Sequence, residues 1–152
     1  MEDYKFIFNE AMREVSLADH IIYTTYPIVK DKALFLSAVN HLTNSAVKAI
    51  NSYLSKEKYY KRILMVPESN RLKVRMFIEK YSSDMNINQD FWNSLLDMVE
   101  LADSKPSRIQ FEKQDTLCIV NENYRMFRFD MDKVKKHLIL VKDLIRKIDN
   151  KL

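Results

Sequence analysis

Residues 31–54, DKALFLSAVNHLTNSAVKAINSYL, decide the fold. Mostly apolar side chains recur here at alternating steps of three and four residues, the spacing that places them on one face of an α-helix. The members of this stripe are Leu36, Val39, Thr43, Ala46, Ile50 and Tyr53. The carboxylate of Asp31 is suited to capping the first turn. We predict one long helix from Asp31 to about Leu64.

The segment before this stretch has the same periodicity. Its stripe consists of Tyr4, Phe8, Ala11, Val15, Ala18, Ile22 and Thr25. Pro27 disfavours helical backbone at Tyr26, so the sequence predicts a first helix over about residues 3–25 and a turn through Pro27–Lys30. Because each apolar stripe needs a covering partner, we expect the two helices to pack as an antiparallel hairpin.

The remainder of the chain changes its periodicity once. Capping residues predict helices that begin at Ser69, after Asn86 with Gln89 as capping partner, and near Asp130 or Asp132. Residues 109–129 instead contain short runs of β-branched and aromatic residues between turn signals, which predicts an antiparallel hairpin of two or three strands. The expected fold is mainly α: a single domain over residues 1–152, an antiparallel helical bundle with a small β-hairpin insert before the C-terminal helix.

Composition excludes several classes of site. The chain has no glycine, which removes the phosphate-binding loop, the dinucleotide fingerprint and the nucleophile elbow. Its one cysteine, Cys118, allows no internal disulfide and no cysteine-rich zinc site, and we expect it to be an inert buried thiol. No Glu-x-x-His or His-Glu-x-x-His motif occurs, so we expect no metal and no cofactor.

Charge and hydropathy suggest a location and limit the partners. The longest uncharged runs are interrupted by Asn, His, Ser and Thr, and the first residues lack a signal-peptide pattern, so we expect a cytoplasmic protein without membrane contact. The net charge is +4, with acidic and basic residues interspersed. This distribution argues against a dedicated nucleic-acid surface but leaves RNA open as a partner.

Polar side chains form a second stripe on each of the first two helices. The candidate ligand-binding residues are Arg13, Ser16, His20, Ser37, His41 and Lys48. In an antiparallel hairpin these side chains share one groove, where the cations could bind phosphate and a histidine could act as acid or base. The alternative is that the stripes are simply the solvated faces of two amphipathic helices. No catalytic residue is assigned, and His137 is expected to be a hydrogen-bonded histidine at the edge of the core.

The run SLADHIIYTTYP (16–27) followed by residues 31–54 resembles the paired long helices of the HEPN superfamily of prokaryotic helical bundles, and looks more closely like an uncharacterised archaeal protein family. The likeness covers about residues 10–62. It implies a bundle that often dimerises and, in active members, an RNase motif of an arginine shortly before a histidine near the last helix. Here Arg125 and Arg128 lie too far before His137, and the better-spaced pair, Arg13 and His20, lies in the first helix.

Two functional hypotheses follow. The first is a non-catalytic helical interaction module that binds a protein partner or self-associates as a homodimer, because the apolar face of the second long helix is broader than one neighbour can cover. The second is a HEPN-like RNA-processing or nucleotide-binding bundle that uses Arg13, His20, His41 and Lys48. The sequence leaves enzymatic activity open but favours a protein without it.

Overall fold

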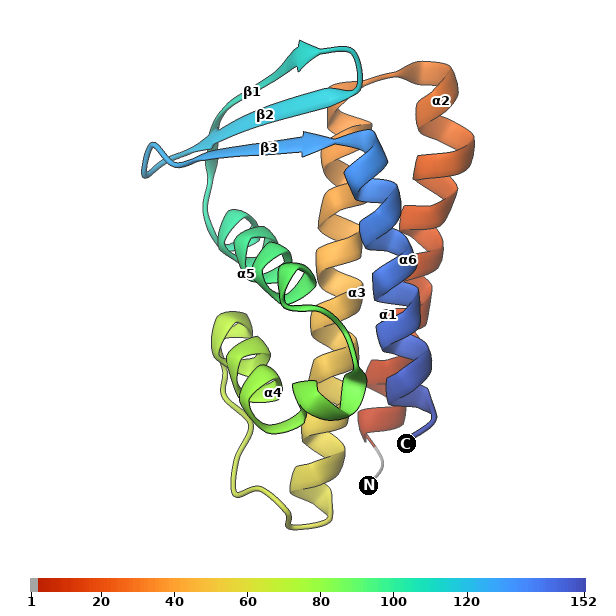
Figure 1. Cartoon of the computed structure of the whole chain (residues 1–152), viewed down its shortest axis with the longest axis vertical. Coiled ribbons are helices and arrows are strands. Elements are labelled where there is room, and N and C mark those ends of the chain that lie inside the picture. The colour runs from red at the N-terminus through yellow and green to blue at the C-terminus, as the bar shows by residue number, and fades with distance from the viewer. Residues whose placement is uncertain (1–2) are drawn as a thin grey trace.

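One long central helix organises the molecule. The structure is a computed structural model that describes residues 3–152, and 70% of the chain is helical. Helix α3 (Lys32–Tyr59) runs through the centre, with α1 (Asp3–His20) and α6 (Met131–Asp149) on one side and α4 (Asn70–Met85) and α5 (Gln89–Asp103) on the other (Figure 1). A small sheet lies across one end. The predicted mainly α bundle with a β insert before the last helix is therefore confirmed.

Helix α3 is buried over most of its circumference. It contacts α1, α4, α5 and α6, and its buried side chains include Leu42, Ala46 and Ile50. The broad apolar face that motivated self-association is thus covered within the chain. Asp31 caps the helix as predicted, since its side chain accepts a hydrogen bond from the Ala33 amide at 3.0 Å. The helix ends at Tyr59, before the predicted Leu64.

The predicted end of the first helix before Pro27 is wrong. Helix α1 continues through a π-helical turn, η1 (Ile21–Thr25), into α2 (Tyr26–Val29). Proline has no N–H, and its ring clashes with the carbonyl four residues earlier in an α-helix. In the wider π turn the Tyr26 amide donates to the Ile21 carbonyl, five residues back, which lets the helix accommodate Pro27. The chain then turns at Lys30, which adopts a left-handed conformation with φ 55°.

The helices on the other side begin at side-chain caps. Ser69 caps α4, accepting from the Leu72 amide at 3.1 Å, as predicted. The predicted cap of α5 is corrected: Asn88, not Asn86, accepts from the Phe91 amide at 3.0 Å. Asn86 instead ends α4 in a left-handed conformation with φ 51°. Asparagine suits both roles, because its short polar side chain caps helices and tolerates left-handed backbone.

The insert has three strands, the larger of the two predicted alternatives. Strands β1 (Pro106–Lys113), β2 (Thr116–Asn121) and β3 (Met126–Asp130) form an antiparallel sheet in the order β1-β2-β3. Asp130 ends β3 and also caps α6, accepting from the Asp132 amide at 2.8 Å. The last helix therefore begins where predicted, and no linker separates it from the sheet.

Candidate functional site

The predicted polar track is divided among three surfaces. His41 and Lys48 lie on α3 beside α1, where the His41 Nδ1 is 2.5 Å from the Glu14 carboxylate. The Lys48 Nζ lies 3.4 Å from Glu10 and 3.5 Å from Glu14. The structure thus joins these two predicted residues through two carboxylates that the prediction omitted.

The other four predicted residues are more dispersed. Ser37 and His41 line the same shallow hollow beside β1. Ser16 lies in a different groove, between α1 and α6. Arg13 and His20 are exposed, and at about 100° per residue they lie on the side of α1 that faces away from the buried stripe. The six residues therefore do not line one groove.

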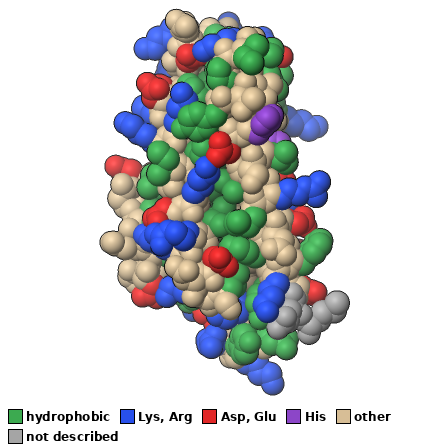
Figure 2. Space-filling model, turned by 90° about the vertical axis from the view of Figure 1, so that its right-hand side faces the viewer, with side chains coloured by type: hydrophobic (Ala, Val, Ile, Leu, Met, Phe, Trp, Pro, Cys, Tyr) green, Lys and Arg blue, Asp and Glu red, His purple; other side chains and the backbone are tan. Residues whose placement is uncertain are grey.

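Glu10 and Glu14 change the electrostatics of the seam between α1 and α3. A phosphate placed near His41 and Lys48 would meet both carboxylates, which repel an anion. The face turned to the viewer in Figure 2, the right-hand side of Figure 1, shows acidic and basic side chains interspersed, with no broad area of one charge. The arrangement agrees with an ion-paired helix seam, and a ligand-binding role for the predicted residues stays a prediction.

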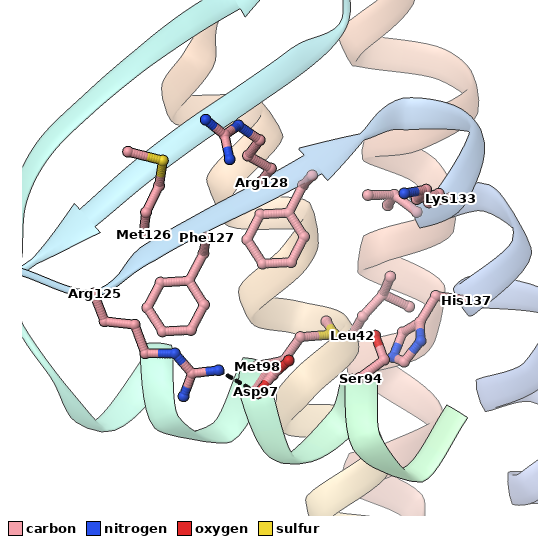
Figure 3. Close-up of a pocket in the computed structure, with 12 residues that line it drawn as sticks. Leu42, Ser94, Asp97, Met98, Arg125, Met126, Phe127, Arg128, Lys133 and His137 are labelled. Carbon is pink, nitrogen blue, oxygen red and sulfur yellow. Dashed lines mark hydrogen bonds and ion pairs between the residues drawn. The ribbon is translucent and has the colours of Figure 1, made fainter. Parts of the chain in front are cut away.

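A cavity of about 190 Å³ lies at the opposite edge of α3, under strand β3 (Figure 3). It is enclosed by residues 125–129, by Ser94, Asp97 and Met98 of α5, by Lys133, Val134 and His137 of α6, and by Leu42 of α3. Its wall is about half apolar, and three cations and one carboxylate surround it. Figure 3 shows Phe127 pointing from the strand towards α5.

The cavity follows the edge of β3. A hollow against one face of a sheet touches alternate residues, because successive side chains point to opposite faces. This cavity is lined by five consecutive residues, including the buried Phe127 and the exposed Met126 and Arg128. It therefore runs along the strand, beside the backbone.

The backbone groups on that edge are free to pair. The Asn121 amide donates to the Arg125 carbonyl at 3.0 Å, and the Met131 amide to the Asp115 carbonyl at 2.9 Å. Since alternate residues of an antiparallel strand face the same neighbour, the odd-numbered residues of β3 bond to β2. The N–H and C=O groups of Met126 and Arg128 point to the open edge, because β3 is the last strand of the sheet.

His137 is the buried polar group of the cavity. Its ring is 8% exposed and stacks on Phe91, with 4.9 Å between the ring centroids. Burial lowers the pKa of His137 from its ordinary 6.5 to about 4, so the imidazole is neutral at pH 7. The predicted hydrogen bond is not found: within residues 3–152 the Nε2 has no partner. Ring stacking and apolar packing, which sequence spacing does not reveal, hold this side chain.

The three cations around the cavity differ in their partners. Arg125 binds Asp97 at 2.7 Å and also pairs with Glu100, which ties the start of β3 to α5 (Figure 3). Arg128 holds Glu112 of β1 at 2.8 Å on the outer face of the sheet. Lys133 is exposed and forms no ion pair with any residue that the structure describes. It is the cation left for a negatively charged partner.

No known family accounts for these features. No family model matches the chain, and no curated protein or solved structure is significantly similar to it. The resemblance to HEPN bundles thus stays a prediction. The structure does bring Arg125, Arg128 and His137, which sequence spacing kept apart, to the wall of one cavity.

The arrangement is suited to binding. Both arginines are held by acids, and His137 is neutral with no group in residues 3–152 oriented to activate it. No group of three or more His, Cys, Asp and Glu side chains in the described part is placed to hold a metal. No helix of residues 3–152 is both long and apolar enough to cross a membrane. The cavity offers an open strand edge, a partly apolar wall and the unpaired imidazole of His137.

Proposed function

We propose that this protein is a non-catalytic interaction module that self-associates through the free edge of β3. One observation carries the proposal: β3 presents the unpaired backbone of Met126 and Arg128 beside a partly apolar cavity. Unpaired strand edges recruit a further strand, because each backbone N–H and C=O gains a hydrogen bond. We propose a cytoplasmic location, which agrees with the single free thiol of Cys118.

A second copy of the chain is a natural partner for such an edge. Two antiparallel β3 strands related by a two-fold axis present the same groups to each other, so one contact satisfies both copies. The paired strands would extend two three-stranded sheets into one. Met126, whose side chain is 49% exposed, would lie within the contact.

Sedimentation equilibrium at micromolar concentrations tests the proposal, with a dimer as the expected result. In Met126→Pro the outward N–H is removed while the hydrogen bonds from β3 to β2 remain, because proline is tolerated where a strand N–H faces outward. We expect this variant to be monomeric. Met126→Ala, which keeps the N–H, is the matched control and should still dimerise. A monomeric wild-type protein would contradict the proposal.

A further inference from the structure

The turn between β2 and β3 holds one aromatic side chain in solvent. Tyr124 is 90% exposed, and its backbone is left-handed with φ 63°. A left-handed conformation costs a residue with a side chain about 1–2 kcal/mol. Exposed and strained aromatic residues call for an explanation outside the monomer's own packing, since neither property stabilises the isolated chain.

This turn is rigid. The buried Asn121 side chain accepts hydrogen bonds from the amides of Asn123 at 3.0 Å and Arg125 at 2.9 Å. The Tyr124 amide donates to the Asn121 carbonyl at 3.0 Å. These bonds fix the backbone at Tyr124 before any partner binds, which reduces the conformational entropy lost on binding.

The cavity under β3 has the chemistry of a tyrosine site. Its wall combines Leu42, Met98 and Phe127 with the unpaired imidazole of His137 and the hydroxyl of Ser94. An apolar ring that ends in one hydroxyl matches a wall that combines apolar side chains with a buried hydrogen-bonding group. A smaller aliphatic side chain would leave the polar groups without partners.

Pairing of two β3 strands brings the tyrosine to the cavity. If Met126 lies opposite Arg128 of the partner subunit, antiparallel counting sets the partner's Tyr124 level with Asp130, between the β3 residues and the α6 residues that line the cavity. Tyr124 lies outside β3, so its side chain is not bound to the alternation of that strand.

We infer that the cavity is a binding site for Tyr124 of a second copy. This inference rests on the self-association proposed above and adds to it one specific contact, the insertion of Tyr124 into the cavity of the other copy. Each copy supplies one tyrosine and one cavity, so a symmetric dimer contains the contact twice. The open edge determines that strands pair, and the tyrosine determines the register.

Single variants test the role of Tyr124. Tyr124→Ala should weaken the dimer about 30-fold in sedimentation equilibrium, the effect expected for loss of a buried interfacial tyrosine. Tyr124→Phe, which keeps the ring but not the hydroxyl, should weaken it less. Tyr60→Ala is the control, because Tyr60 is a half-exposed tyrosine in the segment that follows α3. It should leave the dimer unchanged.

A mixing experiment tests whether the contact crosses between copies. Ser94→Phe fills the cavity, so this variant keeps Tyr124 but loses the cavity. Tyr124→Ala keeps the cavity but loses the tyrosine. Each variant alone should dimerise weakly, and an equimolar mixture should form heterodimers in excess of the statistical share because one intact contact remains. Circular dichroism at 222 nm and the melting temperature verify that both variants are folded.

The outcomes separate the two proposals. If Tyr124→Ala dimerises as the wild type does while Met126→Pro is monomeric, strand pairing stands and the tyrosine-binding site is refuted. If the mixture shows only statistical exchange, the tyrosine-binding site is refuted as well. If the wild-type protein is monomeric, both proposals fail together. Excess heterodimer with an unchanged Tyr60→Ala control supports both.

Discussion

The two edges of the sheet are built differently. Strand β1 is interrupted by register irregularities near both of its ends and begins at Pro106. The Lys32 side chain donates to the Ile109 carbonyl at 3.2 Å and so occupies part of the outer edge. Strand β3 pairs with β2 in an unbroken register and borders a cavity.

This contrast shows which edge is protected. Bulges, a proline and charged side chains are the usual devices that prevent a strand edge from pairing with another chain. All of them occur on β1, which also carries the exposed Arg108 and Lys113. Both charged residues of β3 are engaged within the chain, because Arg128 is paired with Glu112 and Asp130 caps α6. A chain that protects only one edge leaves the other for a partner.

Amide hydrogen exchange gives the largest expected contrast. In dilute solution the amides of Met126 and Arg128 should exchange roughly 1,000 times faster than those of Phe127 and Phe129, which open only with the fold. At concentrations where dimers form, the Met126 and Arg128 amides should become slow. The outward amide of Ile109 on β1 should stay fast at all concentrations. Slowing at Ile109 in place of Met126 would reverse the comparison.

As the pH falls, the β3 side of the sheet should lose stability before the β1 side does. The folded pKa of His137, about 4, lies below the ordinary 6.5, so the unfolded chain binds a proton first as the pH falls. The free energy of unfolding should therefore drop by about 3 kcal/mol between about pH 6.5 and pH 4. His137→Phe, which keeps the stack on Phe91, should show a flatter profile in urea titrations across this window. Equal slopes in both proteins would contradict a neutral buried histidine.

The β1 side should respond at lower pH and more weakly. At the β1–β2 turn Asp115 accepts hydrogen bonds from the Lys30 Nζ and the Tyr26 hydroxyl, each at 3.0 Å. The hydrogen bond from Lys30 is the main cause that lowers the pKa of Asp115 below its ordinary 3.8. Its stabilisation is present above about pH 4 and is lost below, where the carboxylate becomes protonated in the folded protein.

Substitution isolates that contribution. Asp115→Asn tolerates the left-handed backbone at this position, φ 58°, but loses the ion pair with Lys30. We expect the free energy of unfolding to fall by about 0.5–1 kcal/mol at neutral pH, the range for a partly exposed ion pair. Thermal melts at neutral pH and near pH 3 should differ from the wild type only at the higher pH. A loss that persists near pH 3 would point to a steric cause.

The smallest effect is expected at the protected edge itself. Lys32→Met removes the donor to the Ile109 carbonyl, and the free energy of unfolding should change by no more than about 0.5 kcal/mol. The oligomeric state should be unchanged, because Pro106 and the bulges still disturb the edge. Species larger than a dimer in sedimentation velocity would mean that Lys32 alone protects β1.

The helices could be predicted because their signals are local. The caps at Asp31, Ser69 and Asp130 and the three-four spacing lie within a few residues of the structure they specify. The continuation past Pro27 could not, because a π turn is rare and proline ordinarily signals the end of a helix. The cap of α5 was misassigned for another reason: asparagine suits both a helix start and a left-handed helix end, so sequence alone does not tell the role of Asn86 from that of Asn88.

The site was harder to predict because it joins distant elements. Glu10 and Glu14 are four residues apart, a spacing common on any solvated helix face, so the sequence does not show that they pair with His41 and Lys48 across the seam. The cavity depends on α3, α5, α6 and β3 together, and the position of β3 at an edge follows from strand order, which sequence does not state. His137 was singled out, but its missing hydrogen bond depends on packing against Phe91.

The shared residue Asp130 makes a strand and a helix into one mechanical part. Helix α6 has 19 residues, so it extends about 28 Å from the sheet, and it ends near Lys151, whose carbonyl accepts from the Lys56 side chain of α3. Because no linker separates them at Asp130, a force applied to β3 is transmitted directly along the axis of α6. A partner held on the strand edge would thus pull on a rod that reaches the opposite end of the bundle, where α3 ends.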